Sequence, residues 1–228
     1  MSELLPIFPL PNVVLFPGVF LPLHIFEPRY REMVADALST DRMIGMVLLR
    51  PGWQPAYEGR PPVYPMGCSG VITHVESLPD GRYNIVLRGV ERFRILEEND
   101  EKSYRRAIVE AAPDLAGTGD DHAAVRRQRS KLETLLAPAV ERSISGAGRL
   151  ESIGSGGRDP KIPSTMADED LVNALAQYLD LEPLEKQALL EQQSLRRRAE
   201  SLVELLEMKI LIARTPGVSN VAHGHSRT

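Results

Sequence analysis

Histidine is the side chain best suited to proton transfer or metal binding near neutral pH, and the chain has five of them. Only His223 and His225 lie close together, in a polar segment beside Gly and Ser. That setting favours a frayed chain end over a metal site. His24 alternates with Leu23 and Ile25 in an apolar stretch, so we interpret it as structural rather than as a catalytic base. The histidines therefore predict no metal site.

The sequence lacks the short motifs that mark nucleotide or catalytic sites. It contains no G-x-x-x-x-G-K-[ST] loop, no G-x-S-x-G elbow, no H-E-x-x-H and no paired C-x-x-C. The glycines of 154–157 lead into Arg158, Asp159 and Pro160 rather than into a helix, so they form no phosphate cradle. We therefore expect no catalytic residues and no cofactor, and we predict that the chain is not an enzyme.

Composition, charge and cysteine usage bound the class of protein and its compartment. The 228 residues are 43% hydrophobic and 25% charged, with a net charge of −4, as in ordinary globular proteins. Cys68 is the only cysteine and can form no internal disulfide, so we expect a cytoplasmic protein. The apolar start has no Lys or Arg before Arg29 and carries five prolines, which argues against a signal peptide or a membrane span.

Two basic clusters raise the question of nucleic-acid binding. They are formed by Arg126, Arg127, Arg129 and Lys131, and by Arg196–Arg198. No aromatic side chains lie among them, whereas surfaces for single-stranded nucleic acid combine the two. We interpret both clusters as solvated, partly ion-paired helix faces, and we expect no nucleic-acid partner.

Aromatic residues and prolines divide the chain into two parts. Eleven of the twelve aromatics and thirteen of the eighteen prolines lie in residues 1–114, a composition that favours strands and turns. The remainder is rich in Leu, Ala, Glu, Gln and Arg, which favour helices. We therefore predict a β-rich lobe over 1–114, a helical lobe over 115–214 and a flexible tail over 215–228.

The first part contains about six apolar runs of strand length. They cover residues 4–10, 19–26, 43–49, 67–78, 83–96 and 104–111. A helix is predicted to begin at Pro28, because apolar residues then recur at helical spacing, at Tyr30, Met33, Val34, Ala37 and Leu38. We expect a turn at 79–81 and a bulge at Gly89.

The second part predicts helices over 121–144, from a cap-like segment at 165–168 to about Leu181, from Pro183, and from a Ser194 cap. Pro138 is expected to kink or shorten the first of them. The glycine-rich stretch 146–164 lacks apolar periodicity, so we predict a mobile connector there.

Two consecutive motifs carry a specific family resemblance. Residues 9–18 read P-L-P-x-x-V-L-F-P-G and residues 23–30 read L-H-I-F-E-P-R-Y. Together they resemble the opening of the Lon N-terminal domain family, and the similarity continues through residues 44–47, 67–72, 87–95 and 184–191. The resemblance implies an α+β fold, in which a curled β pseudo-barrel with one packed helix is followed by a C-terminal α-helical bundle.

The resemblance also implies a function. In Lon proteases this domain precedes an ATPase module and a Ser-Lys peptidase domain, and the chain ends where the ATPase would begin, so we expect a stand-alone member without either. Such a domain would recognise unfolded or damaged polypeptide, or a protease partner. The alternative is a small-molecule or RNA-binding pseudo-barrel, which rests on fold analogy.

One long loop is the best candidate for partner binding. Residues 50–64 contain the only Trp, two Tyr and four Pro between two predicted strands, and long loops in compact domains are usually functional or disordered. The alternative is that Trp53 covers the end of the barrel. The candidate partner-binding residues are Trp53, Tyr57 and Tyr64 and, in the 11–18 loop, Val13, Val14 and Phe16.

Overall fold

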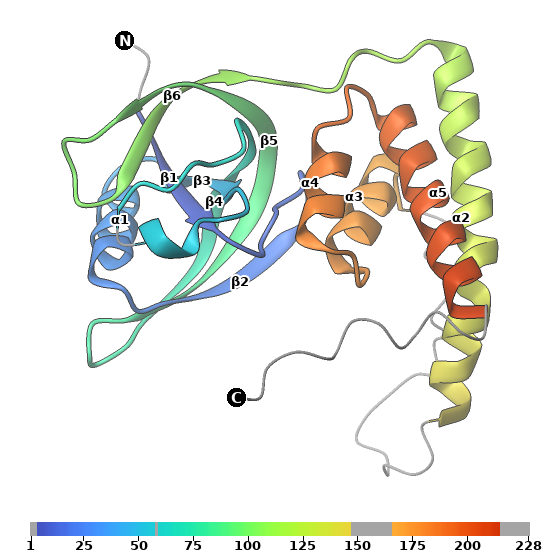
Figure 1. The fold of residues 1–228 in the computed structure, drawn as a ribbon, viewed down its shortest axis with the longest axis horizontal. Helices are drawn as coiled ribbons and strands as arrows, with labels where there is room; N and C mark the ends of the chain where they lie inside the picture. Colours follow the sequence, from blue (N-terminus) through green and yellow to red (C-terminus); the bar gives the residue numbers. More distant parts are fainter. Residues whose placement is uncertain (1–3, 58, 147–165, 215–228) are drawn as a thin grey trace.

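Six strands in the first part of the chain form one mixed sheet that closes on itself (Figure 1). The computed structural model describes residues 4–57, 59–146 and 166–214. The sheet order is β2-β5-β4-β3-β1-β6, β5 also pairs with β6, and β1 and β3 run parallel. The strands are β1 Leu5–Leu10, β2 Phe20–Ile25, β3 Met43–Leu48, β4 Met66–Ser77, β5 Tyr83–Asn99 and β6 Arg105–Ala111.

Closure of the sheet depends on β5, which has 17 residues and pairs with three other strands. Its register with β4 shifts beside Gly89, which confirms the predicted bulge. The Gly89 N–H donates to the Val19 carbonyl at 2.9 Å, and its carbonyl accepts from the Gly18 N–H at 2.9 Å. A Cβ at Gly89 would overlap the Phe16 carbonyl oxygen, so this close approach of two backbones requires glycine.

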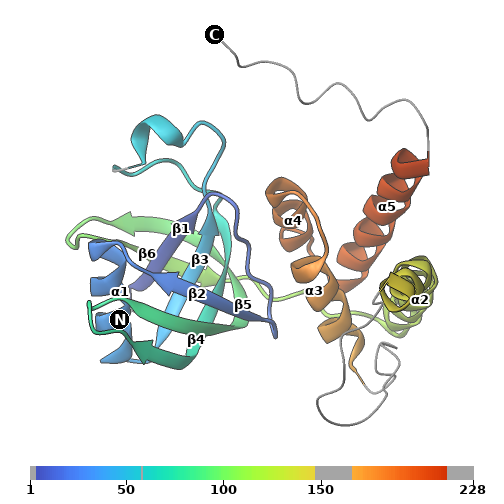
Figure 2. The same ribbon diagram turned by 90° about the horizontal axis from the view of Figure 1, so that it is seen from below.

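Helix α1, Pro28–Leu38, lies against the barrel as its spacing predicted (Figure 2). Its buried side chains are Tyr30, Met33, Val34 and Ala37. The ring of Tyr30 lies 4.4 Å from the ring of Phe8 on β1, centroid to centroid, which ties the first turn of the helix to the sheet.

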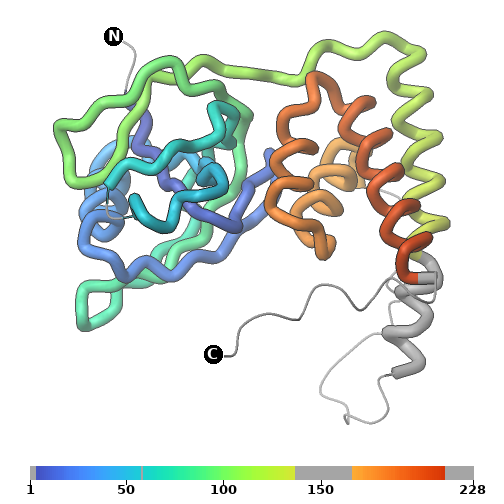
Figure 3. The backbone as a smooth tube through the Cα atoms, in the orientation of Figure 1, coloured from blue at the N-terminus to red at the C-terminus, as the bar shows by residue number. Residues whose placement is uncertain are grey.

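Four helices follow the barrel: α2 Gly119–Gly146, α3 Asp168–Tyr178, α4 Pro183–Leu190 and α5 Leu195–Arg214. The chain crosses to α2 at the far side of the bundle, and α3 and α4 then face the barrel (Figures 1 and 3). The predicted fold class, a closed β-rich sheet with one packed helix followed by a helical bundle, is confirmed.

The helix boundaries agree with the sequence in part. Pro183 begins α4, and the Ser194 hydroxyl accepts a hydrogen bond from the Arg197 N–H at 3.3 Å, so the predicted cap of α5 is confirmed. Pro138 does not shorten its helix, because α2 continues to Gly146, and the alternative that it kinks the helix stays a prediction. The cap of α3 is Ala167, without a side-chain bond, and that helix ends at Tyr178.

A single apolar cluster extends from the barrel into the helical bundle. Its most deeply buried members are supplied by both parts and include Phe16, Met33, Ile44, Leu87, Val172, Ala176, Ala199 and Leu202. The predicted connector over 146–164 falls largely, and the tail with His223 and His225 wholly, outside the described residues. Within the described ranges, no helix is long and apolar enough to cross a membrane.

Candidate partner-binding loop and the cavity beneath it

The loop between β3 and β4 projects from the barrel and is closed at its base (Figure 2). The Arg50 N–H donates to the Pro62 carbonyl and the Tyr64 N–H to the Leu48 carbonyl, both at 2.9 Å. A bridge between Leu49 and Val63 lies between these bonds. One turn of 3₁₀ helix, Gln54–Ala56, forms the outer part of the loop, which is therefore a structured element.

Tyr57 fixes the loop to the start of α1. Its hydroxyl donates to Glu27 Oε1 at 2.6 Å, and Arg29 Nη1 donates to its carbonyl at 3.3 Å. The Arg29 guanidinium lies 5.0 Å from the Tyr57 ring and 4.7 Å from the Tyr30 ring, within range of cation–π attraction to both. Burial, followed by the Glu27 hydrogen bond, raises the pKa of Tyr57, so the hydroxyl stays protonated and keeps donating.

Trp53 is half-buried and leans on Tyr57. Their ring centroids are 5.2 Å apart with an interplanar angle of 63°, an edge-to-face contact. Tyr64 is also half-buried, packs against the core and lies 5.5 Å from the Arg50 guanidinium. The three predicted loop residues therefore differ in setting: Tyr57 anchors the loop, Tyr64 belongs to its base, and Trp53 is the large apolar group at its outer part.

The second predicted loop lies at the junction between barrel and bundle. Val14 is 3% exposed and Phe16 is 0% exposed, while Val13 is half-buried. The Phe16 N–H donates to Gln177 Oε1 at 3.2 Å, and Asn173 Nδ2 donates to the Pro17 carbonyl at 3.2 Å. Val14 and Phe16 are thus core residues that join the two parts of the fold, and we do not retain them as partner contacts.

A cavity of about 250 Å³ lies beneath the β3–β4 loop, between the start of α1 and the β5–β6 turn. Two of its side chains are held firmly: Arg105 binds Glu98 through Nε and Nη2 at 2.7 and 2.6 Å, and Tyr104 donates to Asp36 at 2.7 Å. The lining residues are Pro9, Arg29, Tyr30, Leu49, Tyr57, Gly59, Arg60, Pro61, Lys102, Ser103, Tyr104 and Arg105. They come from four separate segments, so no spacing in the sequence indicated this site.

Two arginines that connect barrel and bundle are deeply buried. Arg92 on β5 is 4% exposed and Arg198 on α5 is 0% exposed, and both bind Asp114, at 2.6 and 2.8 Å. Arg198 also donates to Asn173 Oδ1 at 3.0 Å, and Arg92 donates to the carbonyl of Leu190 at 2.8 Å. The prediction of a solvated basic face is therefore wrong for Arg198, because its guanidinium is the point at which α3, α5 and the 112–118 crossing meet.

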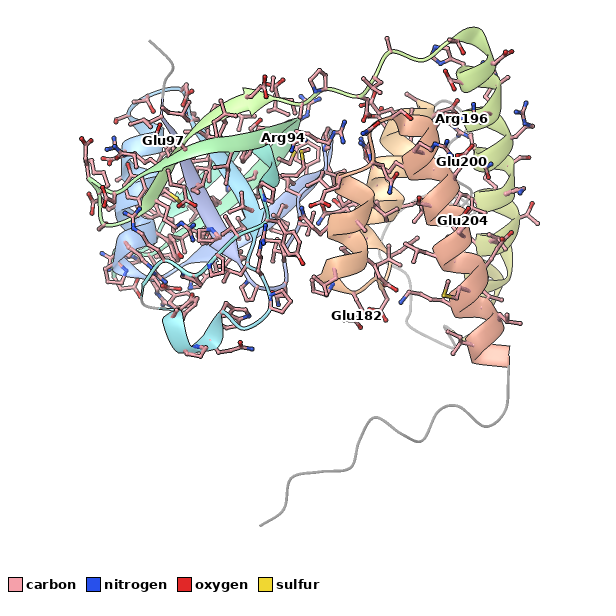
Figure 4. The ribbon with its side chains drawn as sticks, turned by 45° about the horizontal axis from the view of Figure 1, so that its top comes forward. Arg94, Glu97, Glu182, Arg196, Glu200 and Glu204 are labelled. Carbon is pink, nitrogen blue, oxygen red and sulfur yellow. The ribbon has the colours of Figure 1, made fainter. Side chains whose placement is uncertain are left out.

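The remaining basic side chains of the two clusters behave more nearly as predicted. Arg196 and Arg197 are 41% and 68% exposed and pair with Glu200, to which Arg196 lies close in Figure 4. Arg129 is the exception on α2: its side chain is 13% exposed and it pairs with Asp168 and Glu133, both at 3.0 Å.

Other groups that could do chemistry are occupied or buried. Burial raises the pKa of the Cys68 thiol to about 12, so this cysteine is not a thiolate at neutral pH. His24 Nδ1 lies 2.7 Å from Asn84 Oδ1 and its Nε2 lies 3.1 Å from Arg82, as expected of a structural histidine. In the part of the chain that the structure describes, no cluster of His, Cys, Asp and Glu could hold a metal ion.

The arrangement of closed sheet and following bundle is that of Lon N-terminal domains. It matches the N-terminal domain of Mycobacterium avium complex Lon protease with a TM-score of 0.62 and 16% identity, over 90% of this chain and 98% of that one. A Lon N-terminal domain protein from Xanthomonas campestris matches with a TM-score of 0.54 and 22% identity, over 94% and 99% of the two chains. These likenesses show the fold.

The sequence itself shows the family. Residues 4–208 match the model of the ATP-dependent protease La (LON) substrate-binding domain, and the chain belongs to this family. Lon protease 2 of Myxococcus xanthus is 29% identical over 211 residues, which are 91% of this chain and 24% of the relative. The Lon protease of Paraburkholderia phytofirmans is 29% identical over 93% of this chain and 25% of the relative. The chain thus spans about a quarter of the length of these relatives.

Proposed function

We propose that the chain is a non-catalytic module that recognises unfolded or damaged polypeptide, with the β3–β4 loop as its contact surface. The family description, a substrate-binding domain, supports recognition of a polypeptide. The observation that carries the choice of surface is the contact of Trp53 with the anchored ring of Tyr57 on a projecting loop. The buried thiol of Cys68, the only cysteine, is compatible with a cytoplasmic setting.

The loop is suited to this role because its aromatic side chains are held before a partner arrives. Tyr57 is fixed by Glu27, and Trp53 rests on Tyr57, so few rotamers are lost when a partner covers them. Trp and Tyr are also the residue types that most often dominate binding energy at interfaces. An apolar side chain of an unfolded partner protein would pack on the half-buried indole of Trp53, and this contact requires no particular partner sequence. Val13, which is half-buried in the 11–18 loop, remains a secondary candidate for partner contact.

The test is capture of a reduced, alkylated and therefore permanently unfolded protein by the full chain. Trp53→Ala should weaken binding by about tenfold, since an interface anchor contributes on the order of 1 kcal/mol or more. Tyr64→Ala should weaken it less, because that ring is partly in the core. Tyr57→Phe keeps the ring but removes its hydrogen bond to Glu27. A loss of affinity smaller than that of Trp53→Ala would show that anchoring of the loop contributes to binding.

Phe26→Ala is the matched control, because this aromatic side chain is 60% exposed and lies outside the loop. It should leave both capture and melting temperature unchanged. Equal losses for Phe26→Ala and Trp53→Ala would mean that exposed aromatics bind without selectivity. Full capture by Trp53→Ala would refute the assignment of the loop. Displacement of the unfolded protein by an RNA oligonucleotide would favour the RNA-binding alternative.

A further inference from the structure

Four basic side chains contribute to the wall of the cavity beneath the loop. They are Arg29, Arg60, Lys102 and Arg105, and no Asp or Glu lines it among the residues that the structure describes. Three of these cations have carboxylate partners that are not among the lining residues. A ligand in the cavity would therefore meet hydrogen-bond donors first.

The cations of the wall differ in how they are paired. Arg29 pairs with Glu27, Arg105 with Glu98, and Lys102 with Asp36 at 3.1 Å. Arg60 donates to the Asn99 carbonyl at 3.2 Å and has no ion pair within the described residues. A second carboxylate near Lys102, Glu32, is 3.8 Å away and 44% exposed, so solvent screens much of its charge.

Three tyrosines and three apolar side chains also contribute to the wall. Burial raises the pKa of Tyr30, Tyr57 and Tyr104, so all three hydroxyls stay protonated at neutral pH. Those of Tyr57 and Tyr104 already donate to carboxylates, whereas the Tyr30 hydroxyl has no hydrogen-bond partner among the residues that the structure describes. Pro9, Leu49 and Pro61 supply apolar surface beside them. The wall thus offers both donors and a flat apolar lining.

The size of the cavity limits its ligand. Its volume of about 250 Å³ corresponds to roughly eight water molecules at about 30 Å³ each. Pockets for drug-sized ligands begin at about 300 Å³, so a nucleotide would not be enclosed. A ligand with a single carboxylate and one apolar side chain has a volume that fits this cavity.

We propose that this cavity binds a carboxylate attached to one apolar or aromatic side chain. The same chemistry is offered by the last residue of a polypeptide and by a free N-acylated amino acid. Capture of a chain-terminal carboxylate is an established mode of peptide recognition, and hydrogen bonds from Arg to a carboxylate are among the strong ones. Binding of a polypeptide end rests on the proposed function, because the loop would hold the residues that precede the carboxylate. Binding of the free acid does not depend on the proposed function.

Titration calorimetry on the full chain tests the proposal with four probes. They are a short peptide ending in phenylalanine, the same peptide amidated at its C-terminus, N-acetylphenylalanine and inorganic phosphate. The free-acid peptide should bind at least about tenfold more tightly than the amide, which lacks the charge. Tighter binding of the peptide than of N-acetylphenylalanine assigns the chain end as the ligand, and equal binding assigns the free acid. The fluorescence of Trp53, the only tryptophan, should change on binding because its neighbour Tyr57 lines the cavity.

Exposed residues at the cavity allow variants that spare the fold. Arg60→Gln should weaken binding of the free acid about tenfold, and Ser103→Glu, which adds a negative charge to the lining, should weaken it further. Arg94→Gln is the matched control, because this arginine is exposed on β5 (Figure 4) and does not line the cavity.

Several results would overturn the carboxylate site. They are equal affinities for acid and amide, tighter binding of phosphate than of N-acetylphenylalanine, and wild-type affinity in both Arg60→Gln and Ser103→Glu. Because N-acetylphenylalanine is tested without any polypeptide, its failure to bind is separable from failure of the loop to capture unfolded protein.

Discussion

Asp114 is the carboxylate on which two buried guanidiniums depend, and replacing it by asparagine should destabilise the fold strongly. Its carboxylate oxygens lie 2.6 Å from Arg92 Nη2 and accept hydrogen bonds from Arg198 Nη2 and Nη1 at 2.8 and 3.0 Å, where the barrel meets the bundle. Asparagine keeps the shape and one acceptor oxygen but removes the only carboxylate bound to either arginine within the described residues. Two buried positive charges would then face each other without compensation.

The expected loss follows from the burial of the group. Removing one partner of a buried ion pair costs about 3–5 kcal/mol, and the 22% exposure of the Asp114 side chain places the effect near the lower end, at about 3 kcal/mol. With a urea dependence of about 2 kcal/mol per molar, the unfolding midpoint should fall by roughly 1.5 M.

Urea unfolding at neutral pH should be followed by two signals. Trp53 fluorescence reports on the barrel, and far-ultraviolet circular dichroism reports mainly on the helices. In the natural sequence the two transitions should coincide, because one apolar cluster includes residues of both parts. In Asp114→Asn both midpoints should fall together, by the roughly 1.5 M expected for a two-state transition. Glu97→Gln, at an exposed position on β5, should change stability by less than about 0.5 kcal/mol. A loss of under 1 kcal/mol for Asp114→Asn would show that the two arginines do not depend on this carboxylate.

Two further predictions concern the backbone and pH. Gly89→Ala should lower the free energy of unfolding, measured with urea, by about 3 kcal/mol, because the new Cβ would overlap the Phe16 carbonyl oxygen. Gly119→Ala is the control and should be nearly neutral, because the space around Gly119 is open. Equal stabilities of the two variants would contradict this explanation. Hydrogen bonds from Thr118, followed by that from Arg196, lower the pKa of Asp121 to about 2, so its contribution to stability is present above the unfolded value and is lost as the pH falls from about 4 to about 2. An NMR titration should find this midpoint, and Arg196→Gln should raise it; an Asp121 midpoint near 4 in the natural sequence would refute the assignment.

The sequence by itself determined the elements and the family, because these depend on local spacing and on contiguous motifs. Apolar residues at Tyr30, Met33, Val34 and Ala37 predicted α1 and its buried face, since helical periodicity is a property of neighbouring residues. The six apolar runs predicted the six strands, since a run of apolar residues is also a property of neighbouring residues. The two motifs over residues 9–18 and 23–30 together indicated the family that the match over residues 4–208 shows.

The tertiary structure alone decided which side chains are buried and which meet. Arg197 and Arg198 are adjacent and chemically identical, yet one is 68% exposed and the other 0%. The face of α5 that carries Arg198 packs against α3 and α4, where its guanidinium binds Asn173 and the Leu189 carbonyl. Phe16 in a proline-rich loop appeared accessible by sequence, and the bundle covers it. The cavity joins residues as distant in sequence as Pro9 and Arg105, which the antiparallel pairing of β1 with β6, with Ile7 opposite Arg105, brings to one wall.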